Sequence, residues 1–315
     1  MVGKRSVAYH GRSASIVGSR FEKRADRVRY WPVVLISMIV VPMLVVLGFY
    51  AAVPAQAAGP APVDILSAGN YVILGNTGIT NTGTTSITGN IGTSSTAGSL
   101  TGFALDLPVD SPYATSIYVT GNVYAYDYAD PTPAEMTAAS DDMLTAFGNA
   151  AGLPADGDKN NLWSGDLTGQ ILVPGTYVWT SAVGVSAAGG VTLSGTASDV
   201  WVFQITGVLS LGSGASVNLT GGALASRVFW QVAGSVTLGT TSHMNGTILC
   251  STDIAMSNGA TLVGKALAQT AVTLDGNIIT DTGGSVIPEF SQVLIPLVGL
   301  MFVVAIVSRF RNQSK

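Results

Sequence analysis

The side chains that could perform covalent or acid–base chemistry in this 315-residue chain are few. The single cysteine, Cys250, lies seven residues from His243, and a thiolate next to an imidazole would be a nucleophile. Cys250 lies in an apolar run, however, which favours a small buried side chain, and His243 is more typical of a polar turn. The chain has no G-x-S-x-G elbow and no H-E-x-x-H motif. We therefore expect no catalytic residue, no metal site and no cofactor.

The acidic residues also fit solvated positions better than chemistry. Asp141 and Asp142 lie together in a predicted helix, where adjacent carboxylates are usually exposed to water rather than an acid–base pair. Residues 156–161 resemble the start of a calcium loop, but Asn161 replaces the turn glycine and Leu167 replaces the bidentate glutamate. A polar turn is the better interpretation.

The low and mainly acidic charge of the chain argues against nucleic-acid partners. Charged residues make up 10% of the chain, while hydrophobic residues make up 47%. Residues 60–285 hold three basic and fifteen acidic residues. Nucleic-acid binding needs cations to neutralise phosphates, so we expect none. The same shortage argues against an enzyme that cleaves acidic polysaccharides.

The elements that must position any site follow from an internal repeat. An apolar–small–apolar phrase that soon meets a turn begins at Val191, Leu209, Val236, Ile254 and Val272. Three steps are 18 residues and one is 27. Alternation of this kind predicts a strand, and 18 residues suit one coil of a β-solenoid with three strands. The second position of each phrase should then form an outward column of Thr192, Ser210, Thr237, Ala255 and Thr273.

Such a column could order water. Threonine carries a hydroxyl and a methyl on a stiff side chain, and stacked strands would repeat these groups at fixed spacing. The competing interpretation is that threonine is simply a good strand residue.

One helix interrupts the strands, at about residues 133–150. Thr132 and Glu135 have the spacing of a capping box, and Pro133 suits the first turn. Its apolar stripe should pack on its own domain. The sequons at Asn218 and Asn245 are candidate glycosylation sites.

The two ends of the chain look like export and anchoring segments. We expect a basic cytoplasmic segment at 1–30 and a signal peptide or transmembrane anchor at 31–57, with small residues at a cleavage site. A linker at 58–64 precedes the domain at 65–280. A second linker at 281–290 leads into an apolar tail at 291–315 that ends in basic residues.

Several stretches resemble the DUF3494 ice-binding protein family. They are 71–74 (YVIL), 77–79 (TGI), 83–92 (GTTSITGNIG), 200–205 (VWVFQI), 229–232 (FWQV), 237–243 (TLGTTSH) and 266–275 (ALAQTAVTLD). The resemblance implies an all-β fold, a right-handed discontinuous β-solenoid with three faces and one long helix alongside. It also implies binding to ice through one flat face without catalysis. We expect the protein to be a monomer.

The resemblance adds further candidates for the ice-binding residues. Some family members carry a T-A/G-x-T/N motif, which residues 82–85 match in full and residues 96–99 in part. Ala255 and Asp275 interrupt the grid. The candidate residues are therefore Thr82, Thr84, Thr85, Thr96, Thr192, Ser210, Thr237 and Thr273. The alternative is a structural or adhesive surface protein of the same fold without ice affinity.

The tail resembles a second family. Pro288, Glu289 and Phe290, followed by an apolar segment and basic residues, resemble the PEF-type archaeal sorting signal. This resemblance implies removal of the tail by an archaeosortase and anchoring at the cell surface.

Overall fold

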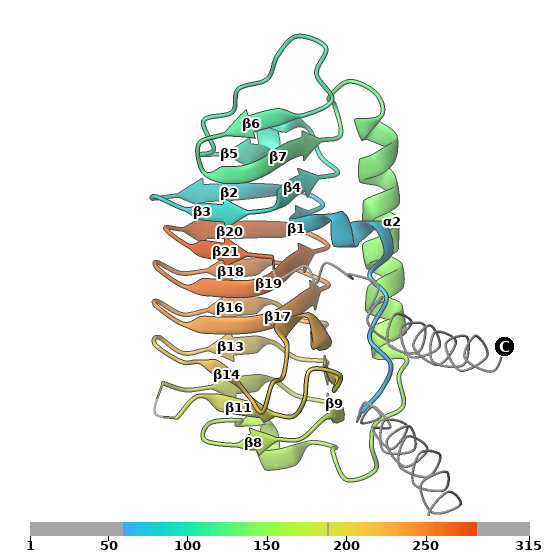
Figure 1. Ribbon diagram of the computed structural model, residues 1–315, viewed down its shortest axis with the longest axis vertical. Helices are drawn as coiled ribbons and strands as arrows, with labels where there is room; N and C mark the ends of the chain where they lie inside the picture. The colour runs from blue at the N-terminus through green and yellow to red at the C-terminus, as the bar shows by residue number, and fades with distance from the viewer. Residues whose placement is uncertain (1–58, 188, 282–315) are drawn as a thin grey trace, which may run out of the picture. The chain divides into compact units, whose positions relative to one another are not determined.

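The chain folds into a stack of coils whose strands pair in parallel, and its apolar and small polar residues alternate along these strands (Figure 1). The computed structural model describes residues 59–187 and 189–281, which belong to the larger of two compact units, Ala55–Lys315. The predictions for segments 1–30, 31–57 and 291–315, and for Pro288, Glu289 and Phe290, lie outside the described residues. Within them, no helix is both long enough and apolar enough to cross a membrane.

The helical elements of the described residues are few and mostly short. They are η1 (Leu66–Asn70), η2 (Ala97–Ser99), α2 (Thr132–Ala151), η3 (Leu162–Gly165) and η4 (Ala225–Arg227).

The strands occupy two separate stretches of the chain. Those before the long helix are β1 (Tyr71–Gly75), β2 (Gly78–Thr82), β3 (Ser86–Thr88), β4 (Asn90–Thr93), β5 (Leu100–Thr101), β6 (Ala114–Ser116) and β7 (Val119–Ala125). Those after it are β8 (Ile171–Leu172), β9 (Gly175–Trp179), β10 (Val183–Val185), β11 (Val191–Ser194), β12 (Trp201–Ile205), β13 (Leu209–Leu211), β14 (Val217–Thr220), β15 (Val228–Val232), β16 (Val236–Leu238), β17 (His243–Cys250), β18 (Ile254–Met256), β19 (Thr261–Ala268), β20 (Ala271–Asp275) and β21 (Ile278–Thr280).

Each coil contributes one strand segment to each of three faces. The face that we call the threonine face is one seven-stranded sheet, in the order β10-β13-β16-β18-β20-β2-β5. The helix face contains β9, β12, β15, β1, β4 and the second halves of β7, β17 and β19. The third face contains β8, β11, β14, β3, β21 and the first halves of β7, β17 and β19. The predicted three-faced solenoid is therefore confirmed.

The stack does not follow chain order. β20 pairs in parallel with β2, β19 with β1, and β21 with β3, so the last coils of the chain support the first ones. We call this junction the seam. In Figure 1, α2 runs along the stack and carries the chain from the upper coils down to β8 and β9. The solenoid is thus discontinuous, as predicted.

The helix occupies Thr132–Ala151, close to the predicted 133–150. Its buried side chains, including Met136 and Met143, pack on Val202 and Leu249 of the helix face. The expected capping box is wrong, because Pro131 is the residue at the N-cap and no side chain caps the helix. The Thr132 hydroxyl instead donates a hydrogen bond to the carbonyl of Pro112, which ties the helix start to the preceding loop.

Aromatic side chains fill the interior of the coils that contain β9, β12 and β15. Phe203 and Trp230 stack with ring centroids 4.0 Å apart, and Tyr177 stacks on Trp179 at 5.8 Å. The buried indole of Trp230 donates its N–H to the carbonyl of Asn245 at 3.0 Å. These stacked rings are almost fully buried and form part of the core between the three faces.

Candidate functional site

The threonine face carries a straight column of small outward side chains. Along its strands, buried and outward side chains alternate. In β16, for example, Val236 and Leu238 are fully buried, while Thr237 between them is exposed. Successive Cα partners across the sheet are Gly184, Ser210, Thr237, Ala255, Thr273, Thr80 and Thr101. Neighbouring strands lie about 4.7–4.9 Å apart, so the column repeats a small group at each such interval. The column continues across the seam, from Thr273 to Thr80.

The hydroxyl groups at the upper end of the column are connected. Thr101 donates through Oγ1 to Oγ1 of Thr80 at 3.1 Å. Thr82, at the edge of the same face, donates to the carbonyl of Leu274 at 3.0 Å. These bonds restrict rotation of the side chains, which keeps the hydroxyls at defined positions.

Two carboxylates interrupt the otherwise uncharged surface. Asp275 is half-buried, pairs with Thr82 across the seam, and accepts a hydrogen bond from the Asn258 amide at 3.3 Å. Asp253 is exposed just before β18. Both lie beside the central column rather than in it.

The candidate residues fall into three groups. Ser210, Thr237 and Thr273 lie in the column, and Thr82 lies at its edge. Thr84, in the turn after β2, and Thr96, just before η2, are exposed but lie outside the strands of the face. Thr85 and Thr192 are not on the threonine face at all.

The expected outward position of Thr85 is wrong. Its side chain is buried, with 3% exposed, and its hydroxyl donates to Oδ1 of Asn81. The backbone N–H of Asn277 donates to the same hydroxyl at 3.3 Å. Thr85 therefore belongs to an internal polar network at the corner of the coil.

The expected place of Thr192 in the column is wrong too. Thr192 lies on β11 of the third face, paired with Asn218 and Ile171. The coil preceding Leu209 places Val183 beside it, 26 residues earlier in the chain. The segment that begins at Val191 has the same apolar–small–apolar pattern because the strands on every face of a solenoid alternate between inward and outward side chains. Its distance of 18 residues from Leu209 joins two different faces and is therefore not the length of a coil.

Sequence reasoning missed Thr80, Thr101 and Gly184. Thr80 stands between buried Ile79 and Asn81, and a buried asparagine hides the apolar alternation. The strand that holds Thr101 has two residues, too few for a periodic signal. Gly184 lies between two valines, and this flanking pattern was the available signal.

The other reactive groups occupy ordinary structural positions. The Cys250 thiol is buried and lies 3.1 Å from the carbonyl of Gly234, to which it donates, and burial raises the pKa of the thiol. His243 is exposed, with Nδ1 at 2.8 Å from the Thr261 hydroxyl. In the polar turn, Lys159 pairs with Asp156 at 2.7 Å. In the part of the chain that the structure describes, no group of three or more His, Cys, Asp or Glu side chains could hold a metal ion.

The two sequons differ in their surroundings. Asn218 is exposed on β14. Asn245 is half-buried, and its Nδ2 donates to the carbonyl of Val217 at 2.8 Å. A glycan on Asn245 would have to break that bond, so Asn218 is the better acceptor.

The fold and the face together define a class: a discontinuous β-solenoid that offers a rigid, flat array of small hydroxyl and methyl groups. Comparison with known proteins identifies the family. Residues 73–280 match the model of the ice-binding-like family, and the chain belongs to that family.

Relatives and solved structures agree with this assignment. An ice-binding protein of Flammulina populicola is 44% identical over 219 residues, which are 69% of this chain and 87% of the relative. One from Flavobacterium frigoris is 41% identical, over 69% of this chain and 76% of the relative. A glycosylated ice-binding protein from an Arctic yeast superposes with a TM-score of 0.69 at 38% identity, covering 73% of this chain and 98% of that structure.

Proposed function

We propose that this protein binds ice through its threonine face, without catalysis. The observation that carries the proposal is the register of the outward column, in which Ser210, Thr237, Thr273, Thr80 and Thr101 are all exposed and aligned across neighbouring strands. The names of the relatives support it, since they are called ice-binding proteins.

The chemistry follows from rigidity and the low charge of the face. A β-branched threonine has a restricted χ1, so little side-chain entropy is lost on adsorption. Hydroxyls can join a water lattice, while methyls occupy the gaps between the water molecules. Each contact is weak, and the regular repeat across the strands makes many of them at once.

A bulky side chain in the column is the direct test. Thr237→Tyr and Thr273→Tyr place rings above a flat surface and should abolish thermal hysteresis and ice shaping. Thr88→Tyr, on the exposed third face, is the matched control and should retain both. Equal activity of all three variants, or a wild-type protein that leaves ice crystals unaltered, would reject the proposal.

The alternative is a structural or adhesive protein of the same fold without ice affinity. The interruptions of the column at Gly184 and Ala255 favour it, because they reduce the number of regularly placed hydroxyls, and the charge of Asp253 beside the column adds to this. It predicts normal folding and no thermal hysteresis at any protein concentration.

We also propose that the protein is exported as a monomer and held at the cell surface. The support is the apolar character of segments 31–57 and 291–315, and the sorting motif Pro288, Glu289 and Phe290. Mass spectrometry of the mature protein tests this, since cleavage after Ala57 and loss of the tail give a defined shorter mass. Sedimentation of the same sample measures its oligomeric state.

A further inference from the structure

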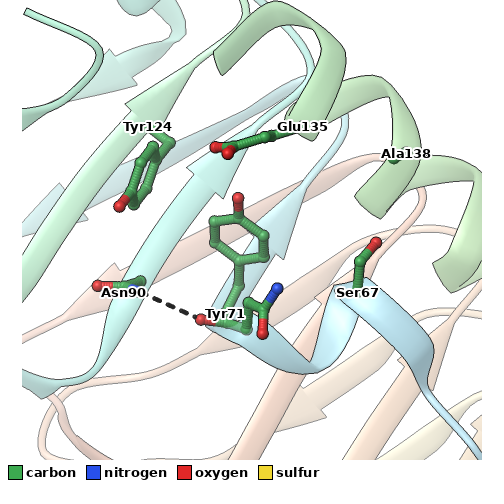
Figure 2. Close-up of a pocket in the computed structure, with 7 residues that line it drawn as sticks. Ser67, Tyr71, Asn90, Tyr124, Glu135 and Ala138 are labelled. Atoms are coloured by element: carbon green, nitrogen blue, oxygen red, sulfur yellow. Dashed lines mark hydrogen bonds between the residues drawn. The ribbon is translucent and has the colours of Figure 1, made fainter. Parts of the chain in front are cut away.

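A cavity on the helix face has no part in the proposed ice binding. It has a volume of about 360 Å³ and lies between the start of α2 and strands β1, β4 and β7 (Figure 2). The lining residues are Ser67, Asn70, Tyr71, Asn90, Tyr124, Glu135 and Ala138. None belongs to the threonine face, so a ligand here would leave the column free.

Tyr71 offers the cavity a hydroxyl that has no partner in the protein. The residue is 5% exposed, yet its phenol makes no hydrogen bond to any other described residue. Figure 2 shows the hydroxyl directed toward Glu135. A phenol that faces an open cavity in this way can donate to a ligand without losing a bond inside the protein. Burial raises the pKa of Tyr71 well above its usual range, and the Glu135 carboxylate raises it further, so the phenol keeps its proton.

Two more groups of the lining can bond to a ligand. The exposed Glu135 carboxylate makes no ion pair or hydrogen bond to the described residues, and a carboxylate is an acceptor only. The Tyr124 hydroxyl accepts a bond from Nδ2 of Asn122 at 3.2 Å, which leaves its own proton to donate. The cavity therefore combines two phenol donors with a charged acceptor.

This set of groups selects among ligand classes. The lining contains no lysine or arginine, so an anion would face Glu135 without compensation. A quaternary ammonium needs open aromatic faces. Tyr71 packs against Tyr124 in a T-shaped arrangement at 5.6 Å and is almost fully covered, so it has no face to offer. A neutral polyhydroxylated ring satisfies both donors and the acceptor.

We propose that this cavity is a binding site for a neutral hexose unit, held by the Tyr71 phenol, the Tyr124 hydroxyl and the Glu135 carboxylate. The site is independent of ice binding. A protein held to a glycan through its helix face would still present the threonine face to its surroundings.

Saturation-transfer NMR with the full-length protein tests the proposal. The probes are D-glucose, D-galactose, D-mannose and N-acetyl-D-glucosamine, with tetramethylammonium as the cationic comparison. At least one sugar should show transfer. Tyr71→Phe should weaken its binding about 3- to 10-fold, and Glu135→Gln about 10-fold or more, because bonds to charged groups are stronger. Asp141→Asn, the same change of charge elsewhere on α2, should have no effect.

Stability and ice activity provide the controls. Tyr71→Phe removes an oxygen that bonds to nothing in the protein, so it should change neither the melting temperature nor thermal hysteresis. No transfer from any of the four sugars would overturn the proposal. So would binding that both variants leave intact, or preference for tetramethylammonium.

Discussion

Substituting Thr85→Val separates a role in the fold from a role on the surface. The Thr85 hydroxyl joins Asn81 to Asn277, two asparagines that are also buried. Asn81 donates through Nδ2 to the carbonyl of Gly102 at 3.1 Å. Asn277 donates to the carbonyls of Ser257 and Ala260 at 2.9 and 3.0 Å. The network thus connects four successive coils across the seam.

The expected cost follows from the groups left without partners. Valine has nearly the shape of threonine, so packing changes little, but the Asn81 oxygen loses a donor and the Asn277 N–H loses an acceptor. Each unsatisfied buried group costs about 1–3 kcal/mol, so the two together give a loss of about 2–6 kcal/mol in the free energy of unfolding. For a domain of this size each kcal/mol lowers Tm by about 2–4 °C, so a mid-range loss of about 4 kcal/mol lowers Tm by about 8–16 °C.

Calorimetry and thermal hysteresis, measured on the same samples, decide the question. Thr85→Ser keeps the hydroxyl and should recover most of the stability. Thr237→Val, on the exposed column, should alter unfolding by less than about 0.5 kcal/mol while reducing ice activity. Thr85→Val should keep its ice activity near 0 °C, where it is still folded. An unchanged Tm together with lost ice activity would show that Thr85 acts at the surface and would refute this reasoning.

Three further substitutions or treatments test other contacts. Lys265 is 8% exposed and donates to Asp281 at 2.6 Å and to the carbonyl of Gly69 at 2.8 Å. Lys265→Met should therefore lower the free energy of unfolding, measured in urea, by about 3–5 kcal/mol. A decrease of less than about 1 kcal/mol would contradict these contacts. The Cys250 thiol is buried, and burial raises its pKa. Iodoacetamide at about pH 8, near the usual thiol pKa, should therefore label Cys250 only after the protein unfolds. Rapid labelling of the native protein would disprove its burial. Asp253→Asn removes a strongly hydrated charge beside the column and should increase thermal hysteresis; an equal or lower value argues that this edge does not meet ice.

The strands, their stacking and the long helix could be predicted from the sequence because each has a clear local periodicity. In Val236–Leu238 and Ile254–Met256 the alternation of a strand and the 18-residue coil agree with each other, so both the strands and their stacking could be read. The helix at Thr132–Ala151 was equally clear, since its stripe of buried methionines and alanines has a different period.

Predictions failed where a tertiary contact replaced a local rule. The spacing of Thr132 and Glu135 fits a capping box, but the carbonyl of Pro112, distant in sequence, accepts the threonine hydroxyl. The T-G-x-T match at residues 82–85 suggested that Thr82, Thr84 and Thr85 all face outward, yet the chain turns after Thr82 and carries Thr85 inside. A motif gives residue types and spacing, and it does not give the corner at which a coil bends.

The seam could not be predicted from the sequence repeat. It joins residues that are about 190 positions apart, as in the hydrogen bond from Thr82 to the carbonyl of Leu274. No period links the two sides, and a one-residue slip of β2 would turn Thr80 inward and Ile79 outward. Burial of Ile79 opposes that slip, and so does the network through Thr85 and Asn277, whose partners exist in one register only. The continuity of the column from Thr273 to Thr80 therefore depends on buried groups that never touch the surface, and these groups belong to the candidate site as much as the threonines do.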